Sequence, residues 1–130
     1  MAEVGSITFT ESRSRTVQNV SMLWVSSAAG AVSGIASPQI SGEILRAVFS
    51  PGAAGLQPTD QYDVTLLDGD GFDVLAGKGA NRSNVNKEQV TPLTGDGVTT
   101  NQRIAVDGTL ELQVAAAGNA KSGTLTIYFR

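Results

Sequence analysis

The chain has 130 residues, a formal net charge of −3, and neither cysteine nor histidine. The length suits one domain over residues 1–130, and the lack of cysteine excludes disulfides and thiolate metal sites. The lack of histidine excludes Ser–His, Cys–His and histidine–metal chemistries, so we expect no enzyme activity, no metal and no cofactor. A net negative chain is also a poor match for nucleic acid, which binds clustered basic surfaces.

The first strands are predicted at Val4–Thr10 and Thr16–Ser26, because their residues alternate between two faces. In the second strand, Val20, Met22 and Trp24 form the expected core face.

Residues 16–42 carry no charge. A membrane span needs about 20 mainly apolar residues, and serine, asparagine, glutamine and proline interrupt this segment. No basic region followed by an apolar core opens the chain, so we expect no membrane anchor, no secretory leader and synthesis in the cytoplasm. The segment instead continues into strands predicted at Ala31–Ala36 and Gly42–Ser50, joined as a hairpin across Ser37-Pro38-Gln39.

Ile44–Phe49 is apolar at every position except Arg46. Such a strand is typically covered on both faces, so we expect either the second sheet and a loop, or a neighbouring subunit, to cover it. Residues 50–58 contain two prolines and two glycines and predict a loop.

The clearest hairpin pattern spans Gln61–Ala76, whose apolar arms flank Asp-Gly-Asp-Gly at residues 68–71. Asp-Gly steps tolerate the positive φ values of tight turns. Asp68, Asp70 and Asp73 could also ligate calcium, which prefers oxygen ligands, although the remaining ligands of a calcium loop are absent. The sequence favours a hairpin turn and leaves a cation site as the alternative.

Residues 77–100 show little alternation and are rich in Asn, Thr, Gly, Lys and Gln. A structureless loop of this length is unusual in a compact domain, so we expect a functional arm or a segment ordered by something outside the chain. Residues 1–15 form a possible second arm. The residues of these segments that we expect at a partner surface are Lys78, Asn81, Arg82, Lys87, Arg13 and Arg15. A solvated loop without a partner is the alternative for residues 77–83.

The last third of the chain returns to clean alternation. The link Ala115–Gly123 predicts that its two strands form an antiparallel pair, and the final strand is expected to be tied into a sheet. The inward residues are expected to be Leu110, Leu112, Val114, Leu125, Ile127 and Phe129.

Strand-like runs separated by turn residues, without intervening helical patterns, are typical of a sandwich or barrel. We therefore predict an all-β, antiparallel β-sandwich, jelly-roll-like, with about eight strands and little or no helix. Trp24, Tyr62 and Tyr128 could stack on sugars, but their positions within strands favour packing in the core or an interface. Asp60 and Asp63 belong to no recognisable catalytic constellation.

Three features of the sequence carry a resemblance. They are the Met followed almost at once by a strand, the stretch ISGEILRAVFSPGAAGLQPTDQYDVTLLDGDGFDVLAGKGAN at residues 40–81, and GTLTIYFR at the end. From about Ser21 to Arg130 the chain resembles small phage virion proteins in general character, without a shared chemical signature. The resemblance implies a capsid cement or decoration protein: a β-sandwich homotrimer in the virion, seated on the major capsid protein where several shell subunits meet. It assigns no role to any numbered residue.

Two other functions fit the same sequence. One is a head–tail connector, neck or tail component of a phage, which copy number per particle would separate from a cement protein. The other is a carbohydrate-binding module, which predicts an exposed aromatic row, although aromatic residues make up only 5% of the chain. A trimer would also account for Ile44–Phe49 and for close packing of the small residues of Ser26–Ala36 around an axis.

Overall fold

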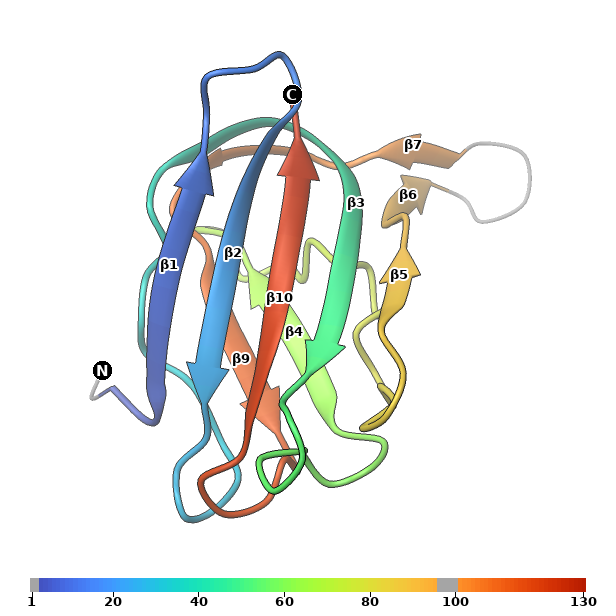
Figure 1. Cartoon of the computed structure of the whole chain (residues 1–130). Helices are drawn as coiled ribbons and strands as arrows, with labels where there is room; N and C mark the ends of the chain where they lie inside the picture. Colours follow the sequence, from blue (N-terminus) through green and yellow to red (C-terminus); the bar gives the residue numbers. More distant parts are fainter. Residues whose placement is uncertain (1–2, 96–100) are drawn as a thin grey trace.

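The computed structural model describes residues 3–95 and 101–130. In this part of the chain every regular element is a strand and every strand pairing is antiparallel (Figure 1). The strands are β1 (Ser6–Ser12), β2 (Gln18–Val25), β3 (Ile40–Pro51), β4 (Asp63–Leu67), β5 (Glu88–Val90), β6 (Leu93–Gly95), β7 (Asn101–Arg103), β8 (Ala105–Gly108), β9 (Glu111–Ala115) and β10 (Ser122–Phe129). The predicted all-β fold is confirmed, with ten strands in the described residues where about eight were expected.

The large sheet has the order β1-β2-β10-β3-β5, and β8 pairs with the first residues of β3. Strand β10 lies between β2 and β3, which confirms that the last strand is tied into a sheet. Its β-branched and aromatic residues suit a pleated, half-buried strand. Alternation turns Leu125, Ile127 and Phe129 into the core, while Thr124 and Thr126 face outward.

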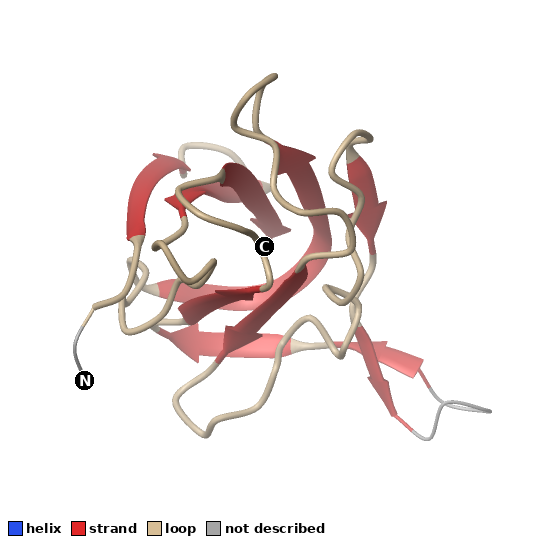
Figure 2. Cartoon of the chain, turned by 90° about the horizontal axis from the view of Figure 1, so that it is seen from below, coloured by secondary structure: helices blue, strands red, loops and turns tan. Residues whose placement is uncertain are grey.

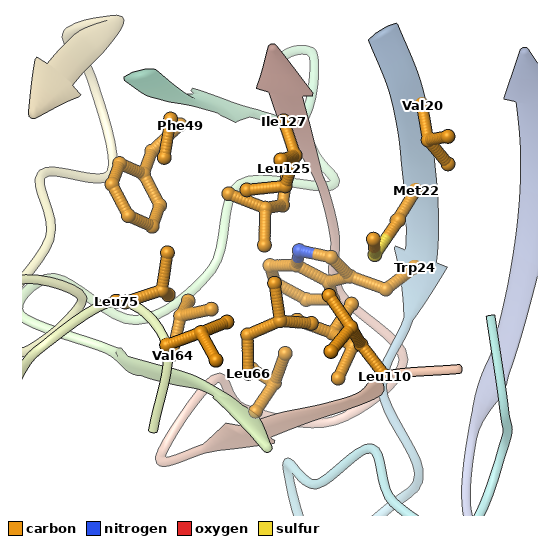
Figure 3. Packing of buried hydrophobic residues seen from close by; sticks show 14 of the residues in the cluster. Val20, Met22, Trp24, Phe49, Val64, Leu66, Leu75, Leu110, Leu125 and Ile127 are labelled. Carbon is orange, nitrogen blue, oxygen red and sulfur yellow. The ribbon is translucent and has the colours of Figure 1, made fainter. Parts of the chain in front are cut away.

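The small sheet consists of β4 and β9 and lies behind the large sheet in Figure 1. Side chains of both sheets meet between them in one buried cluster (Figure 3). Trp24 is 1% exposed there and packs against Tyr62, with ring centroids 5.6 Å apart. Gly123, its partner on β10, makes room for the indole, because a Cβ there would lie 2.5 Å from Trp24 Cζ2. Two sheets facing each other across one core form a sandwich-like arrangement; the jelly-roll connectivity stays a prediction.

The predicted hairpin at Gln61–Ala76 is only half correct. The chain does turn after β4, since Asp68 N–H donates to Phe72 O and Val74 N–H donates to Leu66 O. The second arm nevertheless forms no strand, and β9 is the ladder partner of β4. The sequence pattern identified the turn correctly but not the partner strand.

The predicted pairing of the last two strands is wrong, because β9 and β10 belong to different sheets. The link between them crosses from the small sheet to the large one, and its Ala116 and Ala120 adopt positive φ values of 60° and 52°. Alternation predicts which face of a strand is buried, but it does not predict which strand will be its hydrogen-bonded neighbour.

The predicted hairpin of Ala31–Ala36 with Gly42–Ser50 is also wrong. The described contacts of Ala31–Ala36 are isolated bridges, among them Val32 with Val114 of β9. This segment therefore runs beside the small sheet as a connection between β2 and β3.

Residues 77–95 are more ordered than the predicted loop. Strand β5 pairs with β3, and β6 pairs with β7 in a hairpin that stands away from the two sheets in Figures 1 and 2. Residues 96–100, the remainder of that prediction, lie outside the described residues.

Strand β3 is covered on one face within this chain. Ile44, Ala47 and Phe49 are buried, whereas Leu45 and Val48 remain partly exposed on the other face. Contrary to one expectation from the sequence, no loop within residues 3–95 and 101–130 covers this second face fully, and cover by a neighbouring subunit stays a prediction.

Candidate functional site

The face of the large sheet turned away from the core is nearly free of charge. Cross-strand registers place five strands in rows on this outer face, for example Thr10, Ser21, Thr126, Val48 and Gln89. The outward-facing residues of these rows are Ser6, Thr8, Thr10, Ser12, Asn19, Ser21, Leu23, Val25, Arg46, Val48, Ser50, Gln89, Thr124, Thr126 and Tyr128. Arg46 is the one charged residue in these rows, in a chain that is 16% charged. Beyond the rows, Glu43 of β3 is exposed and alternates with the buried Ile44, so it faces the same way. Depletion of charge on an accessible surface is typical of the centre of a protein interface.

A groove lies on the outer face beside Arg46. The Arg46 guanidinium lies 4.3 Å from the centroid of the Tyr128 ring, and its Nη1 donates to Gln89 Oε1 at 2.9 Å. The groove has a volume of about 650 Å³, and apolar side chains, among them Val17 and Val90, form part of its walls. Among the residues that the structure describes, its lining contains no carboxylate and offers no acid–base pair. The Arg46 guanidinium, placed between apolar walls, is suited to bind a carboxylate that has an apolar group next to it.

The turn after β4 is held by two carboxylates. Asp68 Oδ1 accepts the N–H groups of Asp70 at 2.9 Å and Phe72 at 3.0 Å. Asp73 accepts three backbone N–H groups, from Leu66, Leu75 and Gly77. Asp68 Oδ1 and both carboxylate oxygens of Asp73 are thus committed to the backbone, and the described residues contain no cluster of three potential metal ligands. These carboxylates shape a turn whose tip exposes Phe72 by 71%.

Of the partner residues predicted in the segment before β5, three are accessible. Lys78, Asn81 and Lys87 are exposed, and the Asn81 N–H donates to Asp63 Oδ1. Arg82 instead packs over the edge of the core. Its guanidinium lies 5.3 Å from the Phe49 ring centroid, and its Nη1 lies 3.8 Å from Glu88 Oε1. The expectation that Arg82 belongs to a free arm is wrong.

The predicted residues near the N-terminus lie elsewhere. Arg13 and Arg15 occupy the loop between β1 and β2, where Arg13 donates to Glu11 and to Gln39 O and lies 5.4 Å from the Phe129 ring centroid. Arg13 contacts Gln39, just before β3 begins, whereas Lys87 precedes Glu88, which pairs with Phe49 near the end of β3. The six predicted residues therefore do not form one patch. Residues 6–12 form the edge strand β1 and are not a free arm.

Two of the three aromatic residues considered for sugar stacking are in the core. Trp24 and Tyr62 are each 1% exposed, which confirms core packing for both. Burial, together with the nearby Glu88 and opposed by Arg82, raises the pKa of Tyr62 to about 12. The aromatic row that a carbohydrate-binding module requires is therefore reduced to Tyr128 among these residues.

Sequence reasoning missed the groove and the exposed Phe72. Arg46 interrupts an apolar run, and Phe72 follows an Asp-Gly turn. These two departures from the surrounding pattern were the sequence features that could have indicated the groove and the exposed aromatic side chain. Comparison of the chain with protein-family models, curated proteins and solved structures finds no match. Within the described residues, no helix of the length and apolarity needed to cross a membrane is present.

Proposed function

We propose that the chain is a phage virion structural protein of the capsid cement or decoration type, made in the host cytoplasm and stabilising the head shell by protein–protein contacts. The observation that carries this proposal is the outer face of the large sheet, where the rows that cross five strands contain one charged side chain, Arg46. A face of this kind favours contact with another uncharged protein surface, because few charges have to be desolvated.

A rigid β scaffold suits this role. The core is fixed by packing between two sheets. The accessible groups of the outer face and of the segment before β5 include hydroxyls, isolated apolar side chains and the exposed Lys78 and Lys87. Many such weak contacts made simultaneously to a repeating shell add up to tight attachment. In this proposal the partners are the major capsid protein and further copies of the chain.

Gradient sedimentation with assembled capsids from the genome that encodes the chain tests the proposal. We expect the protein to migrate with capsids and to remain near the top of the gradient without them. A protein that stays at the top with saturating capsids contradicts the proposal.

Point substitutions test the segment before β5. Deletion of residues 81–89 is unsuitable, because it removes Arg82 and part of β5. The double substitution Lys78→Ala/Lys87→Ala is expected to weaken capsid attachment, while the matched control Arg103→Ala/Lys121→Ala keeps it. Equal attachment of both double variants would rule out a capsid contact at these lysines.

A further inference from the structure

The Asp68–Asp73 turn is a preformed projection with an apolar tip. Phe72 is 71% exposed, and Asp70 beside it is exposed as well. The five backbone hydrogen bonds accepted by Asp68 and Asp73 fix the turn before any partner binds. Such a preordered projection loses little conformational entropy on docking, and an aromatic side chain supplies a large apolar contact area.

The groove beside Arg46 has the complementary properties. Val17, which is 42% exposed, and the partly exposed Leu45 and Val90 give it apolar walls, and Arg46 gives it a positive charge. Arginine has five N–H donors, and its hydrogen bond to Gln89 uses one of them. Its volume of about 650 Å³ leaves room for a bulky side chain, and the groove is open to solvent.

We propose that the Asp68–Asp73 turn of one copy docks into the Arg46 groove of the next, with Phe72 between the apolar walls and Asp70 facing the Arg46 guanidinium. A second copy is the occupant because the chain itself carries both halves of the contact, matched in charge and in apolar character. The proposal rests on the self-association part of the proposed function and not on capsid attachment.

The two halves lie on different layers, so the contact joins two different surfaces. The groove is on the outer face of the large sheet, whereas the turn follows β4 of the small sheet behind it (Figure 1). A contact between two different surfaces joins copies head to tail, and such contacts form a ring when the rotation between successive copies closes and an open filament when it does not. A ring of three gives the trimer that the resemblance to cement proteins implies.

The test uses the mass of the full chain in solution, measured by sedimentation velocity. The variants are Phe72→Ser, which removes the tip of the turn, and Arg46→Glu, which reverses the charge of the groove. Val85→Ser is the matched control, because Val85 is 68% exposed at the tip of another turn. Near-UV circular dichroism of the buried Trp24 checks that each variant is folded.

We expect a trimer for the wild type and for Val85→Ser, and monomers for Phe72→Ser and Arg46→Glu alone. An equimolar mixture of the two monomeric variants has one intact turn and one intact groove per pair, so it should form heterodimers that cannot close into a ring. A monomeric wild type, a trimer that persists in either variant, or a mixture without heterodimers overturns the proposal. Capsid sedimentation of the same samples separates the two proposals, because a monomer that binds capsids refutes only the head-to-tail contact.

Discussion

Asp73 offers the sharpest test of how the turn after β4 is held. Its Oδ1 accepts the N–H groups of Leu66 and Leu75 at 3.0 Å each, and its Oδ2 accepts that of Gly77 at 2.9 Å. Leu66 and Leu75 are 0% exposed, so with Asp73 in place these two donors have no contact with water. Gly77 is exposed, and water can replace the carboxylate there.

The cost of Asp73→Ala follows from these two buried donors. An unpaired buried backbone donor costs about 1–3 kcal/mol, so two of them predict a loss of about 3 kcal/mol in the free energy of unfolding. Asp73→Asn keeps Oδ1 for Leu66 and Leu75 but presents an amide NH₂ to the Gly77 N–H, so we expect a loss of about 1 kcal/mol. Asp70→Ala is the control, because no described residue donates a hydrogen bond to the Asp70 carboxylate.

Urea unfolding followed by the fluorescence of Trp24 measures all three variants. The midpoint should fall in the order Asp70→Ala, Asp73→Asn, Asp73→Ala, with an unchanged dependence on urea concentration. If Asp73→Asn is as unstable as Asp73→Ala, or if Asp73→Ala is as stable as the control, the reasoning about the two buried donors is refuted.

Two further predictions concern the core. Gly123→Ala places a Cβ 2.5 Å from Trp24 Cζ2, and overpacking of this kind lowers the free energy of unfolding by about 1–3 kcal/mol. Gly69→Ala is the control, because a Cβ there meets nothing within 4 Å and should leave stability unchanged. Equal urea midpoints for the two variants would contradict the prediction that Gly123 is required by the packing of Trp24. The raised pKa of Tyr62 means that the unfolded chain loses the phenol proton first as pH rises, so stability is complete below pH 10 and falls on the order of 2 kcal/mol by about pH 12. Tyr62→Phe should lose less stability over that interval, and an identical pH profile for both proteins would refute the assignment to Tyr62.

The core-facing residues could be predicted because alternation is a local property. Val20, Met22 and Trp24 face the core as expected, and the inward residues of β9 and β10 do so as well. Strand partners could not be predicted in the same way, since pairing depends on residues far apart in sequence. The Asp73 carboxylate accepts hydrogen bonds from the Leu66 and Leu75 N–H groups. No pattern in the sequence predicts that a side chain would compete with a neighbouring strand for these donors.

The candidate site was predicted in part. Exposure of Lys78 and Lys87 follows from a polar, glycine-rich segment. The role of Arg82 at the core edge was missed because it depends on Phe49, which is distant in the chain. The groove likewise combines Arg46 with residues of two other strands, and a sequence gives no direct signal for such a combination.

The central claim is that the chain acts through contacts with other virion subunits. Quantitative mass spectrometry of purified particles from the genome that encodes the chain tests it most directly, by comparing the number of copies of the chain with that of the major capsid protein. We predict a copy number in fixed proportion to the shell subunits. A few copies per particle would indicate a neck, connector or tail component, and absence of the chain from particles would contradict the account.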